Sequence, residues 1–528
     1  MSGRDPLGRG AEADAGGGML VAGGRWPVAG WGPGASGQGE AGELVPSHYL
    51  EDASGLRGHA ERLLIPANEL EVVEALRDAA AAGVPVTIAG AGTGVTGARV
   101  PFGGWVLSME RFTRLDVHTG YAIVGAGVLL RDLHAAAQRS GQFYPPDPTE
   151  TGSAIGGNIA TNASGSRSFR YGATRRWVER LRVVVADGRI LDAARGDAIN
   201  FDPGTVPLPQ VTKNTAGYLL RPGMDWVDLF IGSEGTLGVI VEATVRLLPA
   251  PGAVLAGVVF FAGDDAAIDA VEQWRETAPA RMLEYIDLPS LNLLRGRFPE
   301  IPKDAGAAIL FEQELASQDD PRGDPHADPR GDPQGDRHGD PEAVAHRDPA
   351  DDPEVDRWLD RIESAGALVE ASWFATTARD RERFRRFRHS LPELVNETVR
   401  RNGALKMHSD YAVPLARNRE MLAYYRARLE AEFPGRYVIF GHIGDAHVHV
   451  NILSDSANAA RASDLLLEFA RHAVNLGGTV SAEHGVGKRK AHLLKLQYAP
   501  EHLEAMRAVK RRLDPNNILG RGTVLGEG

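Results

Sequence analysis

Three glycine-rich segments lie between residues 86 and 241 and constrain the fold more than any other feature. They are VTIAGAGTGVTGARVPFGG at 86–104, PPDPTETGSAIGGNIATNASGSRSFRYG at 145–172 and FIGSEGTLGVIV at 230–241. Small residues allow backbone N–H groups to approach phosphate oxygens without side chains in between. The Asn, Ser and Thr residues of the second segment can add side-chain hydrogen bonds. Together the segments predict a fold that encloses one large cofactor.

The first segment also contains a dinucleotide-binding pattern that we reject. Gly92, Gly94 and Gly97 match G-x-G-x-x-G, but that fingerprint requires a helix to begin at the third glycine. Pro101, Gly103 and Gly104 follow instead. The pattern therefore indicates a phosphate-binding loop outside a Rossmann fold.

Two later segments carry residues suited to catalysis. Residues 441–449 read GHIGDAHVH and residues 481–489 read SAEHGVGKR. His442, His449 and Glu483 offer three ligands for a divalent metal with open coordination positions, and His484 remains as a free imidazole. A neutral imidazole titrates near working pH and suits a general base. This combination predicts an enzyme.

These motifs resemble those of the FAD-linked oxidases of vanillyl-alcohol oxidase type, and among them the D-lactate, glycolate and D-2-hydroxyglutarate dehydrogenases. The resemblance runs from about Pro46 to Leu519 and includes AGAGTGVTG (89–97), KNTAGY (213–218), GSEGTLGVI (232–240) and SAEHGVGK (481–488). It implies an α+β protein of two domains, one for FAD and one substrate (cap) domain. It also implies oxidation of a D-2-hydroxy acid to the 2-oxo acid by hydride transfer to flavin.

The resemblance assigns roles to individual residues. It implies that His484 is the catalytic base, that Arg388 binds the substrate carboxylate, and that His442, His449 and Glu483 hold a divalent metal, Zn being expected ahead of Mn or Fe. Residues 86–104 and 145–172 contain no His or Cys, so we expect noncovalent FAD. The residues expected to bind the cofactor are Gly90, Ala91, Gly92, Thr93, Gly94, Val95, Pro146, Thr151, Gly152, Gly156, Gly157, Asn158, Thr161, Ala163, Ser164, Gly165, Gly235, Gly238, Val239 and Ile240.

Two positions depart from the family pattern. Relatives usually have Asn where this chain has His447, which could be a substrate contact, an alternative ligand or a buried hydrogen-bonding histidine. The family's substrate lysine corresponds to His408 here, with Lys406 displaced by two residues. A dicarboxylate substrate is therefore less strongly indicated than in relatives that keep the lysine.

The chain is long enough for two domains, and its local patterns suggest where they lie. We expect an FAD-binding domain over 47–250, a substrate domain over 251–505, and a C-terminal segment, 506–528, that returns to the FAD domain. Asn68 and Glu71 form a helix-start signal and Gly83 a stop, so residues 68–82 should be helical before a strand at 85–89. Further strands are predicted at 106–109, 122–125, 181–186, 238–248 and 254–261, with helices at 264–277 and 500–513.

Charge and composition restrict partners and compartment. The net charge is −12, but Asp319 to Glu354 contains 12 acidic and 4 basic residues, a net of −8, which leaves −4 for the rest. Residues 320–341 of that stretch form a repeat built on an Asp-Pro-x-Gly unit with almost no apolar residues, so we expect disorder over 317–353, as over 1–46. A nearly neutral body predicts no nucleic-acid partner. No stretch reads as a signal or a membrane span, so we expect a cytoplasmic protein.

The absence of cysteine excludes thiolate iron–sulfur ligands. The electron acceptor should therefore be external, a quinone, an electron-transfer protein or O2, and a homodimer is possible. Two other functions fit some of the motifs. A flavin-dependent transferase of the alkyl-dihydroxyacetone-phosphate synthase type also carries His-Gly-Val-Gly-Lys, but with histidines in place of Ser-Ala-Glu. A zinc hydrolase without flavin would leave the three glycine-rich segments unexplained.

Overall fold

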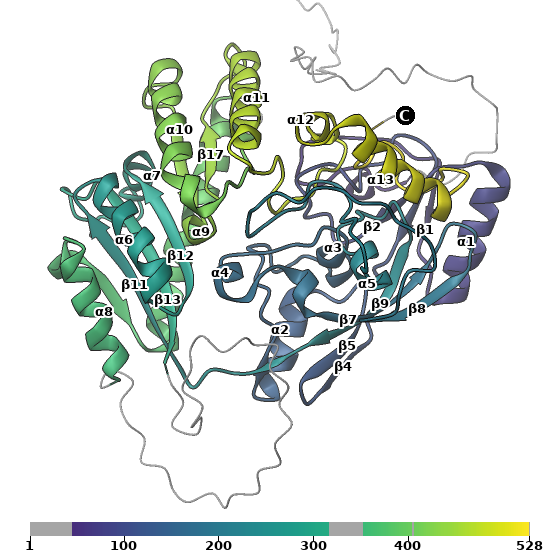
Figure 1. Ribbon diagram of the computed structural model, residues 1–528, viewed down its shortest axis with the longest axis horizontal. Coiled ribbons are helices and arrows are strands. Elements are labelled where there is room, and N and C mark those ends of the chain that lie inside the picture. The colour runs from purple at the N-terminus through teal and green to yellow at the C-terminus, as the bar shows by residue number, and fades with distance from the viewer. Residues whose placement is uncertain (1–44, 316–351, 404–405, 527–528) are drawn as a thin grey trace, which may run out of the picture.

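The computed structural model describes residues 45–315, 352–403 and 406–526. They form two bodies side by side (Figure 1), each built around its own sheet or sheets. The segments predicted to be disordered, 1–46 and 317–353, fall outside the described residues except at 45–46 and 352–353. Of these, Asp352 caps helix α8 and Pro353 is its first residue.

The first body contains a parallel three-stranded sheet in the order β1-β3-β2, with an antiparallel five-stranded sheet in the order β4-β5-β9-β7-β8. The strands are β1 (Arg62–Leu64), β2 (Val86–Ala89), β3 (Trp105–Ser108), β4 (Leu115–His118), β5 (Tyr121–Gly125), β7 (Val178–Val184), β8 (Ile190–Ala194) and β9 (Val239–Arg246). A short pair, β6 (Gln142–Phe143) and β10 (Leu248–Pro249), lies beside them. Helices of this body are α1 (Glu69–Ala82), α2 (Leu130–Arg139), α3 (Ile155–Ala160), α4 (Ser168–Tyr171) and α5 (Trp226–Phe230).

The helix-and-strand unit that precedes the first glycine-rich loop follows the sequence prediction. Helix α1 begins after Asn68, whose side chain accepts a hydrogen bond from Glu71 N at 3.1 Å, and it ends at Gly83 in the left-handed region (φ 67°). Strand β2 follows at once. No helix starts in the described residues 90–104, so the rejection of the dinucleotide fingerprint is confirmed.

The second body is a single antiparallel sheet with seven strands in the described residues, ordered β14-β11-β13-β12-β16-β17-β15. The strands are β11 (Ala253–Phe261), β12 (Ala280–Asp287), β13 (Ala307–Leu315), β14 (Trp373–Ala375), β15 (Met407–His408), β16 (Tyr437–Gly441) and β17 (His449–Ile452). The helices are α6 (Asp264–Thr277), α7 (Leu288–Leu294), α8 (Pro353–Ser364), α9 (Ala378–Arg401), α10 (Asn418–Glu432) and α11 (Ala459–Asn475).

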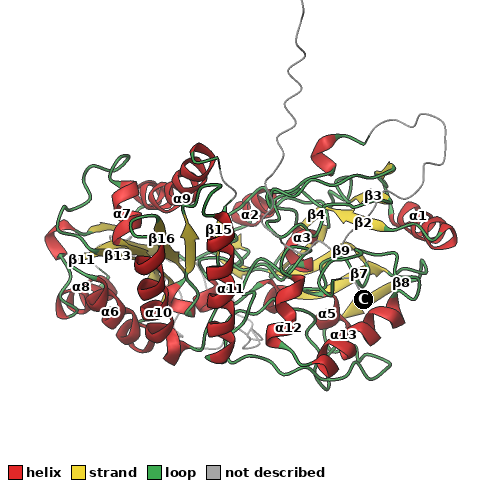
Figure 2. Cartoon of the chain, turned by 90° about the horizontal axis from the view of Figure 1, so that it is seen from above, coloured by secondary structure: helices red, strands yellow, loops and turns green. Residues whose placement is uncertain are grey.

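Helices cover both faces of this sheet (Figure 2). Val259 and Phe261 of β11 belong to the core cluster that includes helices α6, α8, α10 and α11, whereas Val258 and Phe260 belong to the cluster with α7 and α9. Because successive side chains of a strand point to opposite faces, a strand buried on both faces reads as a continuous apolar run. This explains why AVLAGVVFF, unlike an amphipathic strand, shows no alternation.

After α11 the chain crosses back to the first body, where α12 (Leu494–Gln497) and α13 (Pro500–Leu513) lie over it (Figure 1). Beyond α13, Ile518 O accepts a hydrogen bond from Val86 N at 2.7 Å, and Gly520 N donates one to Val86 O at 2.9 Å. Residues 518–520 thus extend the parallel sheet next to β2. No described helix has both the length and the apolar character needed to cross a membrane.

Candidate active site

The three glycine-rich segments meet around one cavity in the first body. Its wall consists largely of backbone and small side chains from residues 88–99 and 153–161, with Glu234, Gly235, Gly238 and Ile240 of the third segment. Asp52, Met109, Ala126 and His484 complete it. A Cβ built on Gly157 meets no atom within 4 Å, because this glycine borders the cavity directly. Such a wall lets main-chain donors reach a bulky phosphate-bearing ligand, so the residues present fit FAD.

Most of the predicted cofactor residues line this cavity or the one next to it. The first cavity includes Gly90, Ala91, Gly92, Thr93, Gly94, Gly156, Gly157, Asn158, Thr161, Gly235, Gly238 and Ile240. Val95, Ala163, Ser164 and Gly165 line the neighbouring one. Pro146, Thr151, Gly152 and Val239 line neither; Val239 is buried in β9 and Thr151 O accepts a hydrogen bond from Arg131 N.

The second cavity, of about 340 Å³, lies between the two bodies and shares walls with the first. Thr93, Gly94, Ser153, Asn158, Thr161 and His484 border both cavities. The remaining wall comes mainly from the second body and includes Glu284, Arg388, Lys406, His408, His442 and His449. A ligand in the second cavity would therefore contact a ligand in the first, with His484 at the junction.

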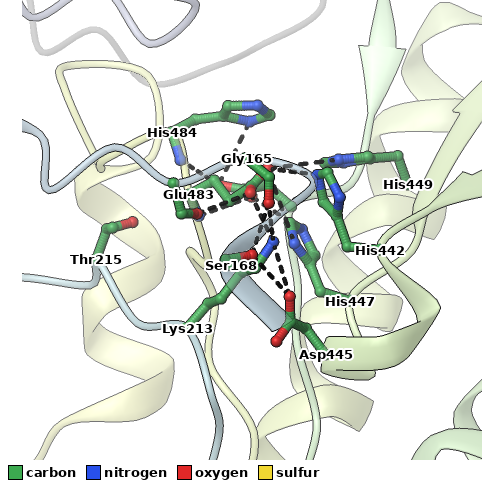
Figure 3. A network of polar contacts seen from close by, with 12 residues as sticks. Gly165, Ser168, Lys213, Thr215, His442, Asp445, His447, His449, Glu483 and His484 are labelled. Atoms are coloured by element: carbon green, nitrogen blue, oxygen red, sulfur yellow. Dashed lines mark hydrogen bonds and ion pairs between the residues drawn. The ribbon is translucent and has the colours of Figure 1, made fainter. Parts of the chain in front are cut away.

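Glu483 lies where the predicted metal ligands converge (Figure 3). Its Oε2 is 3.1 Å from His442 Nε2 and 3.7 Å from His449 Nε2. The donor atoms of His442, His447, His449 and Glu483 all lie within 4.8 Å of one another. Two donors that each lie about 2.0–2.2 Å from one ion are at most about 4.4 Å apart, so shifts of a few tenths of an ångström would bring all four atoms within reach of an ion. The residues present fit a divalent ion.

The other oxygen of Glu483 is occupied by neighbours. Lys213 Nζ and Ser164 Oγ each donate to Glu483 Oε1 at 2.7 Å, and Lys213 is also 3.2 Å from Asp445 Oδ2. Burial disfavours the charged carboxylate, but His442 and Lys213 hold the pKa of Glu483 well below its usual range. Glu483 is therefore ionised, with one oxygen fixed and the other directed at the histidines.

The turn that carries Glu483 and His484 is held by the first body. Glu234, in the left-handed region (φ 53°), accepts hydrogen bonds from Val486 N at 2.6 Å and Gly487 N at 2.8 Å. Burial raises the pKa of this carboxyl to about 7. A Cβ on Gly487 would lie 2.2 Å from Thr96 O, so only glycine fits there. The glycine-rich loops thereby position the turn of Glu483 and His484 and also line the first cavity.

His484 retains access to the second cavity. Its side chain is 28% exposed, and its Nδ1 lies 3.5 Å from Asp410 Oδ2. Burial lowers the pKa of His484, and Asp410 opposes this effect. The imidazole is consequently neutral at pH 7 and able to accept a proton.

Arg388 lies on α9 and faces the same cavity. Its Nε donates to Glu284 Oε2 at 3.0 Å and its Nη1 to Thr149 Oγ1 at 3.3 Å. Glu284 also contacts Nδ1 of His442. The structure therefore brings the predicted carboxylate-binding arginine and the predicted metal ligands into one network.

Comparisons with known proteins agree with this geometry. Residues 60–194 match the model of an FAD binding domain, and residues 341–524 match the C-terminal domain of FAD linked oxidases. A D-lactate dehydrogenase of Archaeoglobus fulgidus is 32% identical over 87% of this chain and 90% of its own length. The chain belongs to the FAD-linked oxidase family.

Other relatives of this FAD-linked oxidoreductase carry related names. The glycolate oxidase subunit GlcD of Bacillus subtilis is 29% identical over 92% of this chain and 93% of its own length. A D-2-hydroxyglutarate dehydrogenase of Xanthomonas citri is 29% identical over 87% and 88%. Among solved structures, alkyldihydroxyacetonephosphate synthase superposes with a TM-score of 0.59 at 16% identity, covering 87% of this chain and 75% of the other. That likeness shows the shared fold and confirms the predicted two-domain α+β architecture.

Several charged residues around the site of this FAD-linked oxidoreductase were not predicted from the sequence, and three of them contact the predicted residues directly. They are Lys213, Glu284 and Asp410, all of them buried. Each is a charged residue in a largely apolar or uncharged stretch, and a buried charge requires a partner. A charged residue in such a stretch could have identified these three as site residues. It could not have shown which residues they contact.

Proposed function

We propose that this FAD-linked oxidoreductase oxidises a D-2-hydroxy acid of the lactate, glycolate or 2-hydroxyglutarate class to the 2-oxo acid, using noncovalent FAD and a divalent metal. One observation carries the proposal: the cavity lined by Arg388, His442, His449 and Glu483 opens onto the glycine-lined cavity at His484. The names of the relatives point to the same substrates.

Different residues of the chain bind the substrate carboxylate, accept the hydroxyl proton and hold the metal. Arg388 binds the substrate carboxylate with the N–H groups that Glu284 and Thr149 leave unused. His484 accepts the hydroxyl proton at Nε2, because its Nδ1 faces Asp410. His442, His449 and Glu483 would hold the metal, which when bound supplies a Lewis acid that lowers the pKa of the hydroxyl. Bound FAD supplies the acceptor for the hydride that leaves the substrate carbon.

Several finer features belong to the same proposal. We assign the FAD domain to 47–250, the substrate domain to 251–505, and the returning segment to 506–528. The electrons leave to an external acceptor, since the chain has no cysteine for an iron–sulfur relay. Zn is the expected metal, ahead of Mn or Fe. Glu483 beside three histidines favours this function over the transferase alternative, and the match to an FAD binding domain disfavours a flavin-free hydrolase.

The decisive experiment is anaerobic mixing of the purified yellow holoenzyme with D- and L-lactate, glycolate and D- and L-2-hydroxyglutarate. One D-hydroxy acid or glycolate should bleach the flavin absorbance, while L-enantiomers should not. Dithionite serves as the control that the flavin can be reduced. The proposal fails if dithionite bleaches the flavin and no hydroxy acid does. Full activity after verified metal removal would rule out the metal's role alone.

A further inference from the structure

We propose that His447 is a fourth protein ligand of the metal, so that three imidazoles and one carboxylate hold the ion. This inference rests on the proposed function, because it concerns the same metal site. The family resemblance supplies only His442, His449 and Glu483, with an asparagine at the position of His447. The replacement therefore puts an imidazole where relatives usually have an amide.

The position of His447 matches that of the other two histidines. Its Nδ1 lies 3.9 Å from Glu483 Oε2, the oxygen that also faces His442 Nε2 at 3.1 Å and His449 Nε2 at 3.7 Å. Figure 3 shows the three rings directed at Glu483 from one side. Because Lys213 and Ser164 occupy Oε1, only Oε2 of this carboxylate is left for an ion. The cluster thus presents three nitrogens and one oxygen.

Each of these histidines also has an acceptor behind it. His442 Nδ1 contacts Glu284 Oε1, His449 Nδ1 lies 3.2 Å from Ser409 O, and His447 Nε2 lies 3.2 Å from Asp410 Oδ1. Metal-bound histidines usually place their second ring nitrogen on such an acceptor, which fixes the tautomer and directs the lone pair at the metal. His447 has its acceptor, Asp410, at a similar distance, although Nε2 makes no hydrogen bond to it, and it would bind the ion through Nδ1 in place of Nε2.

The two other roles considered for His447 fit less well. A purely structural histidine would satisfy both ring nitrogens, but neither ring nitrogen of the fully buried His447 makes a hydrogen bond among the described residues. A residue that contacts the substrate would have to border the second cavity. The walls of that cavity include His442 and His449 but not His447. An ion beside Glu483 would satisfy Nδ1.

A fourth protein ligand changes what the ion can accept. A six-coordinate ion would keep two open positions, enough for the hydroxyl and one carboxylate oxygen of a 2-hydroxy acid. A five-coordinate ion would keep one. Asp410 joins this ligand to the proposed base, because its two oxygens lie 3.2 Å from His447 and 3.5 Å from His484.

The test counts imidazoles around Zn²⁺ in the flavin-loaded protein by X-ray absorption, together with Zn²⁺ affinity measured by chelator competition. We expect three imidazoles in the natural chain, and two in His447→Asn with an affinity lower by about 100-fold or more. His472→Asn, on α11 away from the cluster, should change neither. Retained flavin absorbance shows that each variant is folded.

The outcomes separate this inference from the function it rests on. Two imidazoles in the natural chain, or an unchanged affinity in a folded His447→Asn, would overturn the role of His447 while leaving the metal site in place. No stoichiometric Zn²⁺ in the natural chain would overturn the metal site itself. If His447→Asn does not fold, the imidazole count of the natural chain decides alone.

Discussion

The two cavities are built in opposite ways. The walls of the first cavity, the proposed cofactor cavity, are mostly backbone and small side chains of the three glycine-rich segments, although Arg99, Glu234 and His484 also border it. The second cavity, the proposed substrate cavity, includes some of the same small residues but adds long charged side chains and imidazoles, most of them from the second body. The first can accommodate a large ligand through main-chain donors, and the second can move a proton and hold charge. The comparison predicts that changes in one cavity affect cofactor retention and changes in the other affect chemistry.

The largest effect should come from replacing His484, whose imidazole borders both cavities. His484→Gln removes the proposed base, and flavin reduction by the hydroxy acid should slow by about 10²–10⁴-fold while FAD is retained. Anaerobic stopped-flow absorbance measures the rate, and the flavin-to-protein ratio measures retention. His472→Gln, on α11 and outside both cavities and the metal-ligand cluster, is the control. A rate within tenfold of the natural enzyme would remove His484 from the mechanism.

Filling the cofactor cavity should have the opposite result. In Gly157→Val the new side chain enters the space that Gly157 leaves open, so the flavin-to-protein ratio after purification should fall at least about tenfold. Zn²⁺ content should not change, because the metal cluster lies in the other cavity. Gly296→Val, where a Cβ meets only Leu293 O at 3.8 Å, controls for the substitution. Full flavin content in Gly157→Val would contradict the assigned cavity.

A smaller effect is expected from replacing Arg388, the residue proposed to bind the substrate carboxylate. Arg388→Lys keeps a positive charge beside Glu284 but loses the planar fork, so the KM for the hydroxy acid should rise about tenfold, with a smaller change in kcat. Steady-state kinetics with the substrate found above measure both. Arg385→Lys, on the same helix and 57% exposed, should leave KM unchanged. Equal KM values for the two variants would speak against Arg388.

The smallest effect concerns stability at Asp287, which lies outside both cavities. Asp287 accepts hydrogen bonds from Ser290 N and Ile439 N, both at 2.8 Å, and burial raises its pKa to about 7. Because the folded state binds this proton more tightly than the unfolded state, the carboxyl's contribution is present at low pH and is lost as pH rises through 7. Relative to Asp287→Asn, the free energy of unfolding should fall by about 1 kcal/mol from pH 6 to pH 7.

Urea unfolding of both proteins at these two pH values measures that difference. The activity profile should be the same for both proteins, since neither cavity is changed. The quantity compared is the free energy of unfolding of the natural protein minus that of Asp287→Asn. If this quantity does not fall between pH 6 and pH 7, Asp287 is already ionised at pH 6.

The contrast between the cavities also explains what could be predicted from the sequence. Helix α1, strand β2 and the loop after it depend on local signals such as Asn68, Glu71 and Gly83, so their prediction is confirmed. The network behind the metal ligands depends on how distant strands pair. Tyr285 of β12 pairs with Gly441 of β16, and this register places Glu284 beside His442. Lys213 reaches Glu483 across 270 residues of sequence, and no local pattern encodes that contact.

Strand β2 illustrates a consequence of such distant pairing for biosynthesis. Its outer edge is completed only by Ile518 and Gly520, more than 400 residues downstream of Val86. While the ribosome is still translating the second body, the loop that follows β2 is attached to a sheet lacking its last neighbour. The sheet that carries this loop is therefore complete only after residues 518–520 have been synthesised, and the nascent chain has to protect an open sheet edge until then.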